Sequence, residues 1–309
     1  MTIEKVVDFL KANDNFEILT HNYPDGDCLG SGYGLCLGLQ QLGKNARVIT
    51  TALPKDFKFL LNGVKEQDFR AECVVSVDVA DEKLLGCNQE KYQGKIDLCI
   101  DHHKSNRVDA PLKFVDDTSA AACEIIYRIL TEMGVTFTKE IANCLYTGIS
   151  TDTGCFRYTN TTAATLRICA DLLEYGCDSG YINKVMFETK SKKRIELERE
   201  IYDRMIFCCD DKCAIIYTTL EMTKGLEDED TEGISSIPRQ IEGVKMGITI
   251  REKPDGIYKV SVRTNGDIDA CQFCKQFGGG GHAAASGCTL NGDLQGVIDT
   301  LIEAAERTL

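Results

Sequence analysis

One loop near the N-terminus sets the architecture of this chain: His21-Asn22-Tyr23-Pro24-Asp25-Gly26-Asp27-Cys28-Leu29-Gly30-Ser31. An apolar run at residues 16–20 precedes it and predicts a buried strand, and a Gly- and Leu-rich run at residues 29–42 predicts a packed helix after it. A proline and a glycine bend the loop, so that its histidine and two aspartates can converge. Ligands of open α/β sheets bind at this edge, outside the carboxyl ends of the strands.

The other histidines and several aspartates occupy similar positions. Asp78 and the tripeptide Asp101-His102-His103 each follow an apolar run that predicts a strand. Asp152 follows a predicted helix, and His282 closes a run of glycines. All four histidines of the chain therefore lie in segments of this kind. We expect the N-terminal ones to gather with the aspartates at one edge of a sheet.

This set of side chains offers oxygen and nitrogen ligands without requiring a thiolate. Such ligands suit two divalent cations held close together by a shared carboxylate. Mn²⁺ or Mg²⁺ fits the excess of carboxylates better than Zn²⁺, and Fe²⁺ or Co²⁺ is an alternative. A single aspartate at a strand end is usually a helix cap or a turn former. The joint occurrence of these segments favours a metal site.

Composition and charge restrict the partners. The net charge is −13, which argues against a broad basic surface for long duplex nucleic acid. Most of the sixteen cysteines lie within apolar runs, where they behave as small buried hydrophobes. The first residues show no signal-peptide pattern, so we expect a reducing, cytoplasmic location. No apolar run reaches the ~20 residues that a membrane span needs.

The N-terminal part of the chain predicts a parallel sheet. Strands at residues 16–20, 46–51, 73–77 and 96–100 alternate with helical segments, which predicts helices on both faces of the sheet. A helix running to about residue 133 opens at residues 116–121, where Thr118 or Ser119 can act as its cap. The same helix start can bind an anion, which makes Ser119 a candidate substrate contact.

Two further positions in this part concern ligand binding and packing. Arg157 lies between Phe156 and Tyr158, close to Asp152. The arginine can pair with a phosphate, and either aromatic ring can stack on a base or belong to the core. Gly148 is expected to allow close packing of its helix.

The pattern changes after a charged helix at residues 191–204. We expect residues 1–190 to form a catalytic metal-binding domain, residues 191–205 a helical linker and residues 206–309 a substrate-binding domain. Strands and helices mix in this last part, which predicts a smaller mixed α/β unit. Pro254-Asp255-Gly256 predicts a turn between two of its strands.

The glycine run in this second part predicts an anion site. Consecutive glycines weaken a fold, but their amides can approach a ligand closely. His282 adds a side chain beside them, and Ser286 and Arg263 are further candidates for contact with a phosphate or carboxylate. The candidate substrate contacts of this part are thus Gly279, Gly280, Gly281, His282, Ser286 and Arg263.

The motifs together resemble those of the DHH phosphoesterase superfamily. The resemblance rests on the loop His21-x-x-x-Asp25-x-Asp27-x-x-Gly30-Ser31, on Asp78, on Asp101-His102-His103 and on Asp152. Phe277-Gly278-Gly279-Gly280-Gly281-His282 is similar to the signature of the DHHA1 domain. The resemblance implies an N-terminal DHH domain with a parallel sheet and a smaller C-terminal DHHA1 domain. Within the superfamily, the chain is most similar to the stand-alone branch of nanoRNases and phosphoadenosine phosphatases.

This resemblance also implies a division of the metal ligands. One ion would be held by His21, Asp25 and Asp78, and the other by Asp27, Asp78, His102 and Asp152, with Asp78 shared. Asp78 and His103 would be catalytic, and His103 would contact a phosphoryl oxygen or the leaving group.

The expected function is hydrolysis of phosphoester bonds with two divalent ions, Mn²⁺ first. The substrates would be short oligoribonucleotides, cleaved to 5′-nucleotides, and 3′-phosphoadenosine 5′-phosphate. The alternative is a phosphodiesterase for cyclic dinucleotides or their linear products. A non-catalytic nucleotide sensor would have lost metal ligands, and none is lost here. A homodimer is compatible with the sequence, but no interface can be identified in it.

Overall fold

Residues 1–231, 233–265 and 267–309 are described by a computed structural model of the protein. They divide into two units, Met1–Thr189 and Lys190–Leu309. The charged segment expected as a linker forms helix α8 (Lys192–Asp203), which belongs to the second unit. Its buried Leu197 and Ile201 pack in a small apolar cluster with residues of that unit.

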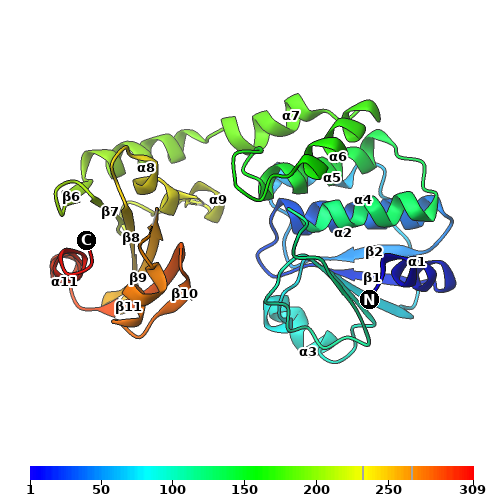
Figure 1. The fold of residues 1–309 in the computed structure, drawn as a ribbon, viewed down its shortest axis with the longest axis horizontal. Coiled ribbons are helices and arrows are strands. Elements are labelled where there is room, and N and C mark those ends of the chain that lie inside the picture. The colour runs from blue at the N-terminus through cyan, green and yellow to red at the C-terminus, as the bar shows by residue number, and fades with distance from the viewer. Residues whose placement is uncertain (232, 266) are drawn as a thin grey trace. The chain divides into compact units, whose positions relative to one another are not determined.

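The first unit is built on a five-stranded sheet in which all strands are parallel (Figure 1). The order is β2-β1-β3-β4-β5. The strands are β1 (Phe16–Leu19), β2 (Ala46–Ile49), β3 (Cys73–Val77), β4 (Leu98–Asp101) and β5 (Leu112–Val115). The sequence did not predict β5, which is short and only half-buried at the edge of the sheet.

Helices cover the two faces of this sheet unequally. Figure 1 shows α2 and α4 on one side of the sheet and α3 on the other. The thicker side contains the main core and the helices α1 (Ile3–Ala12), α2 (Gly26–Gln41), α4 (Ala122–Met133), α5 (Lys139–Asp152), α6 (Ala163–Glu174) and α7 (Ser179–Asn183). The thinner side is covered by the 3₁₀ segment Glu82–Asn88 and α3 (Gln89–Tyr92), with a smaller apolar cluster. The predicted α/β class with a parallel sheet is confirmed.

Helices α2 and α5 approach each other at glycines. A side chain on Gly30 would collide with the carbonyl oxygen of Cys144 in α5. A Cβ atom on Gly148 would collide with the Cys123 sulfur and would lie 2.7 Å from an Asp27 carboxylate oxygen. Gly148 is therefore a close-packing position, as predicted, and it also leaves room for a candidate metal ligand.

We expect Gly148→Ala to lower the free energy of unfolding by about 2 kcal/mol, because the added methyl must displace Cys123 and Asp27 in a packed interior. Urea denaturation of the wild type and the variant measures this difference in the free energy of unfolding. Gly180→Ala in α7 is the matched control, since a Cβ there meets nothing within 4 Å, and it should be neutral or slightly stabilising. Equal stability of the Gly148 and Gly180 variants would contradict the packing argument.

The second unit is built on a mixed sheet with the order β10-β11-β9-β8-β7-β6. Its strands are β6 (Ile206–Cys208), β7 (Cys213–Thr218), β8 (Met246–Lys253), β9 (Ile257–Thr264), β10 (Gly280–His282) and β11 (Ala285–Asn291). Only the β7–β8 pair is parallel. The predicted turn at Pro254–Gly256 joins β8 to β9, with Asp255 in the left-handed conformation.

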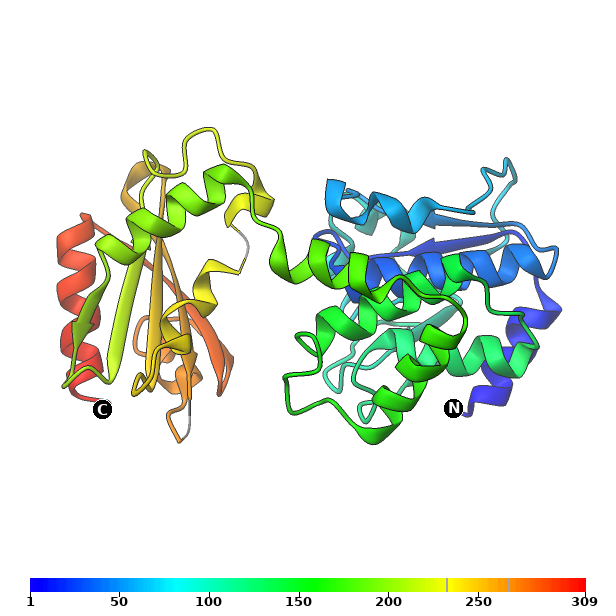
Figure 2. The same cartoon turned by 90° about the horizontal axis from the view of Figure 1, so that it is seen from above.

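The two faces of this second sheet differ. One face carries the main core of the unit with α10 (Ala270–Lys275) and α11 (Leu294–Glu306), the latter red in Figure 2. The other face is partly covered by α8 and by the short segments Ile234–Ser236 and Pro238–Gln240. The short helix α9 (Asp228–Thr231) lies against α8.

The expectations for the cysteines and for membrane spans can be compared with this fold. All sixteen cysteines have free thiols, and most of them are buried. Within residues 1–231, 233–265 and 267–309, none of the helices combines the length and the apolar character that a membrane span requires.

Candidate metal centre

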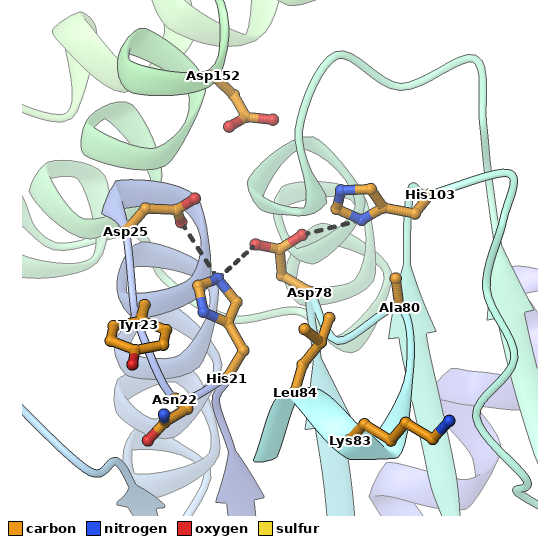
Figure 3. Close-up of a pocket in the computed structure, with 10 residues that line it drawn as sticks. All are labelled: His21, Asn22, Tyr23, Asp25, Asp78, Ala80, Lys83, Leu84, His103 and Asp152. Atoms are coloured by element: carbon orange, nitrogen blue, oxygen red, sulfur yellow. Dashed lines mark ion pairs between the residues drawn. The ribbon is translucent and has the colours of Figure 1, made fainter. Parts of the chain in front are cut away.

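Acidic and imidazole side chains meet at the carboxyl ends of β1, β3 and β4. Helix α2 adds two aspartates from its start, and α5 adds one from its last turn. Figure 3 shows Asp78 between the rings of His21 and His103, with Asp25 and Asp152 nearby. The pocket around them is lined by His21, Asn22, Tyr23, Asp25, Asp78, Ala80, Lys83, Leu84, His103 and Asp152.

One set of contacts centres on His21. Its Nε2 atom lies 3.7 Å from Asp25 Oδ1 and 3.9 Å from Asp78 Oδ2 (Figure 3). Asp25 also caps α2, because its Oδ1 accepts a hydrogen bond from the backbone N–H of Cys28 at 3.0 Å. The capping bond fixes the carboxylate that the histidine faces.

A second set of contacts centres on His102. Its Nε2 atom lies 3.4 Å from Asp78 Oδ1, 3.4 Å from Asp152 Oδ2 and 3.7 Å from Asp27 Oδ2. Asp78 is common to both sets, with a different oxygen facing each histidine. Ligands of one cation held at about 2.1 Å typically lie roughly 3 Å apart, so spacings of this size suit groups arranged around a small ion.

The backbone at Asp78 has an unusual conformation. The residue follows β3 directly and has a φ of 54°, in the left-handed region that non-glycine residues avoid. Its N–H donates to the carbonyl of Ile100 at 3.0 Å, which anchors this turn to β4. A conformation that costs about 1 kcal/mol persists where the surroundings impose it, often at functional sites. Here it is associated with a carboxylate that faces His21, His102 and His103.

Asp27 has a second role that the sequence did not reveal. Its carboxylate accepts hydrogen bonds from the backbone N–H groups of Ala122 at 2.6 Å and Cys123 at 2.9 Å, at the start of α4. The prediction that Thr118 or Ser119 caps this helix is wrong, because α4 begins only at Ala122. The hydroxyls of both residues instead donate to Asp116. A carboxylate from a distant segment thus satisfies the helix start.

Hydrogen bonds fix the tautomer of His102. Its Nδ1 atom lies 3.3 Å from the carbonyl oxygen of Ser119, which can only accept, so Nδ1 carries the proton. The Nε2 lone pair then faces the carboxylates. Ser119 is held in turn by Arg128, which donates to its hydroxyl at 2.7 Å and to Asp116 at 2.6 Å. Such outer hydrogen bonds are typical of metal-binding histidines.

Two buried atoms at the centre have no hydrogen-bond partner among the described residues: His102 Nε2 and Asp78 Oδ1. An unpaired buried acceptor is costly unless another group supplies what it lacks. Both atoms are acceptors that face each other at 3.4 Å, and a cation between them would satisfy both. The residues present therefore fit divalent metal ions.

The pKa shifts of the clustered carboxylates also indicate a site for cations. Burial raises the pKa of Asp78, and the carboxylates of Asp27 and Asp25 raise it further. Burial likewise raises the pKa of Asp27. Burial, followed by Asp27 and Asp78, raises the pKa of Asp152 to about 9. Carboxylates crowded in this way retain protons in the absence of positive charge, and cations would replace these protons.

Asp101 orients His103. The carboxylate of Asp101 is fully buried and accepts hydrogen bonds from His103 Nδ1 at 2.8 Å and Asn106 Nδ2 at 2.6 Å. Burial acts to raise the pKa of Asp101, but these bonds outweigh it and lower the pKa. The second ring nitrogen of His103 is left for a ligand. Sequence reasoning did not assign roles to Asp101 and Asn106; their only signal was proximity to the two histidines.

Cys28 lies close to His21 and Asp78, but it does not act as a thiolate. Burial and the charge of Asp78 raise its pKa well above the usual range. The sulfur accepts from the His21 N–H at 3.2 Å and contacts the Val77 carbonyl at 3.7 Å. The neutral thiol therefore packs and orients the loop, and the candidate ligands remain oxygen and nitrogen atoms.

Comparison with known proteins identifies the family. Residues 15–149 match the DHH family, N-terminal domain, and residues 212–309 match the DHHA1 domain. The chain is 31% identical to the bifunctional oligoribonuclease and PAP phosphatase NrnA of Thermus thermophilus, over 98% of this chain and 93% of the relative. The chain belongs to the DHH family. The family and fold class predicted from its motifs are confirmed.

Other proteins similar to this DHH-family chain also cover most of it. It is 25% identical to the bifunctional oligoribonuclease and PAP phosphatase NrnA of Bacillus subtilis, over 90% of each chain. Among solved structures, an exopolyphosphatase-related protein from Bacteroides fragilis matches with a TM-score of 0.88 and 26% identity. That match covers 99% of this chain and 95% of the other.

The substrate contacts predicted in the first unit are not all brought to the pocket. Ser119 reaches the centre through its carbonyl, since its hydroxyl is occupied by Asp116 and Arg128. Arg157 is exposed, does not line the pocket, and donates through Nε to the Gly154 carbonyl at 2.5 Å. Phe156 packs against Tyr146 at the edge of the core.

In the second unit, the predicted glycine site lies on β10 and the segment before it. Gly280, Gly281 and His282 are exposed. Gly279 packs with no room for a side chain against Cys288 in β11. Gly281 adopts a φ of 149°, a conformation that favours glycine.

The predicted contacts Ser286 and Arg263 do not lie together. Ser286 pairs with Val262 and is buried on the core face, whereas Arg263 pairs with Ala285 on adjacent strands. Because side chains alternate along a strand, Arg263 faces the opposite side of the sheet. The two residues therefore belong to different surfaces of the unit.

Proposed function

We propose that this protein is a metal-dependent phosphoesterase. Its substrates are short oligoribonucleotides, cleaved to 5′-nucleotides, and 3′-phosphoadenosine 5′-phosphate. The observation that carries the proposal is the pair of contact sets around His21 and His102, which share Asp78 and contain unpartnered buried acceptors. The relatives named oligoribonuclease and PAP phosphatase over nearly the whole chain support this choice of substrates.

The residues of the centre would hold two divalent cations, with Mn²⁺ as the first candidate and Mg²⁺, Co²⁺ or Fe²⁺ as alternatives. His21, Asp25 and Asp78 form one ligand set, and Asp27, Asp78, His102 and Asp152 form the other. Such cations would supply Lewis acidity at this site, which would lower the pKa of a nearby water and stabilise negative charge on phosphoryl oxygens.

The chain's own residues position the reacting groups. Asp78 bridges the two ligand sets and fixes their spacing. Asp101 holds the Nδ1 proton of His103, so the other ring nitrogen is directed to a phosphoryl oxygen or the leaving group. Ser119 and Arg128 keep the His102 ring in its binding tautomer. Buried free thiols support a cytoplasmic location. A homodimer stays a prediction.

Turnover of four compounds with Mn²⁺ tests this function: a 5′-phosphorylated RNA trimer, linear diadenylate, cyclic diadenylate and 3′-phosphoadenosine 5′-phosphate. We expect hydrolysis of the trimer and of the phosphoadenosine compound, with a lower rate for the cyclic dinucleotide. Fast cleavage of cyclic diadenylate beside an inert trimer would assign the chain to signalling phosphodiesterases. Tight nucleotide binding without any turnover would indicate a sensor.

A further inference from the structure

The hairpin at the edge of the second sheet carries three of the sixteen cysteines. Its sequence is Cys208-Cys209-Asp210-Asp211-Lys212-Cys213, which ends β6 and begins β7 (Figure 1). Strand β6 is the last strand of the sheet and lies next to β7. The proposed metal chemistry uses none of these thiols, so their grouping suggests a separate role.

The turn of this hairpin has a strained backbone. Cys209, Asp210 and Asp211 have φ values of 56°, 54° and 59°, so three consecutive residues other than glycine adopt the left-handed conformation. Aspartate tolerates this conformation in turns, but it is unfavourable for cysteine. The N–H of Lys212 donates to the Cys209 carbonyl at 3.1 Å and closes the turn. Strain of this kind persists where the surroundings impose it, often at functional sites.

The strand register places Cys208 directly opposite Cys213. Residues in this relation on antiparallel strands have Cα atoms about 4.5–5.5 Å apart and side chains on the same face. Both cysteines accordingly pack with the main core of the unit. Disulfides span Cα separations of roughly 4.4–6.8 Å, so the backbone can accommodate a bond between Cys208 and Cys213 as it stands.

The thiols of this pair are already in contact. A hydrogen bond joins them, and burial, followed by Cys208, raises the pKa of Cys213 above its ordinary value. Cys213 is 0% exposed, whereas Cys208 is only partly buried. Cys208 is therefore the thiol that a reagent in solution can reach, and Cys213 is the partner beneath it.

Cys209 is the competing partner, and its geometry is less suitable. Consecutive Cα atoms lie about 3.8 Å apart, which is below the range that disulfides span, so Cys208 and Cys209 are too close to be joined without distortion. Cys209 also lies in the turn, beyond the residues that pair across the two strands. Burial, followed by Cys208, raises the pKa of the Cys209 thiol to about 11, so this thiol keeps its proton at neutral pH.

We propose that Cys208 and Cys213 form a reversible disulfide when the protein meets a low-molecular-weight disulfide such as oxidised glutathione. The Cys208 thiolate attacks one sulfur of the reagent, which gives a mixed disulfide and releases one reagent thiolate. The Cys213 sulfur then displaces the second reagent thiolate and forms the Cys208–Cys213 bond. The two protein thiols are oxidised, the reagent disulfide is reduced to two thiols, and the two protons pass to the released thiolates.

This modification site is independent of the proposed hydrolysis, because the hairpin contributes no residue to the candidate metal centre. It is also compatible with a reducing compartment, where an accessible pair of this kind stays reduced and is oxidised only transiently. The bond covalently joins β6, a strand of three residues, to its neighbour β7.

Peptide mapping of the full-length protein tests the site. The protein is incubated with oxidised glutathione, the remaining thiols are alkylated, and trypsin cuts after Arg204, Lys212 and Lys224. We expect the peptides 205–212 and 213–224 to be joined, and dithiothreitol to separate them. Two peptides that stay separate, whether they carry glutathione or not, would overturn the proposal.

Variants assign the bond, since Cys208 and Cys209 lie in the same peptide. Cys208→Ser is expected to lower the yield of joined peptides at least about tenfold, whereas Cys209→Ser should keep it. Cys208→Ala repeats the test with an apolar side chain, and circular dichroism verifies that each variant folds. The control is Cys87→Ser, which removes an exposed thiol of the first unit and should give the wild-type yield. A link that survives in Cys208→Ser and Cys208→Ala would contradict the assignment.

Discussion

Replacing Asp78 with asparagine is expected to lower kcat for phosphoester hydrolysis by about 10⁴-fold with saturating Mn²⁺. Asp78 is the only residue common to the contact sets of His21 and His102, so its loss disturbs both metal positions at once. Asparagine keeps the size of the side chain but offers one neutral oxygen in place of two charged ones. The carboxylate that faces each histidine with a separate oxygen is thereby lost.

The experiment requires a carboxylate control outside the centre. Asp117 is exposed, and its nearest cation is the exposed Lys104 at 3.9 Å, so Asp117→Asn should retain full activity. Initial rates are measured over a Mn²⁺ titration, and circular dichroism verifies that both variants fold. If the kcat of Asp78→Asn lay within tenfold of the wild-type value, Asp78 would not be a ligand shared by the two metal positions.

Some features of the centre could be predicted because they are local. Strands β1, β3 and β4 are short buried runs, and a histidine or an aspartate follows each of them within two residues. Parallel strands place their carboxyl ends at one edge, so the convergence of His21, Asp78 and His102 follows from the pattern alone. Asp152 was found because its helix carries it to the same edge.

Other features depend on contacts between distant segments. The capping of α4 by Asp27 joins residues 95 positions apart, and no local propensity encodes it. Strand β5 has only four half-buried residues, too few to show a clear alternation. The separation of Ser286 and Arg263 onto different faces depends on the register of β9 and β11, which a shift of one residue would reverse.

Asp152→Asn should have opposite effects on stability with and without metal. In the metal-free protein, burial and the neighbouring carboxylates raise the pKa of Asp152 from 3.8 to about 9. Below pH 4 the carboxyl is protonated in both the folded and unfolded states and costs nothing. Between these values the unfolded chain releases a proton that the folded protein retains, so stability falls as pH rises. Asparagine removes this penalty.

We therefore expect metal-free Asp152→Asn to exceed metal-free wild type in stability by about 1–2 kcal/mol at pH 8, with the difference vanishing near pH 4. The estimate is modest because the side chain is 26% exposed. Adding Mn²⁺ reverses the order, because wild type gains binding free energy through a ligand that the variant lacks. Activity should fall by at least about 100-fold for the same reason.

Urea denaturation at pH 5 and pH 8, in EDTA and in Mn²⁺, separates the effect of the Asp152 carboxyl on the metal-free fold from its effect on metal binding. A carboxylate retained only for folding would stabilise the metal-free protein, and its replacement would weaken the fold under every condition. A carboxylate retained for a cation destabilises the metal-free fold and stabilises the loaded one. Asp117→Asn should show neither effect, since its carboxylate lies at the surface. Loss of stability by Asp152→Asn in EDTA at pH 8 would therefore reject a metal-ligand role for Asp152, whatever happens to the activity.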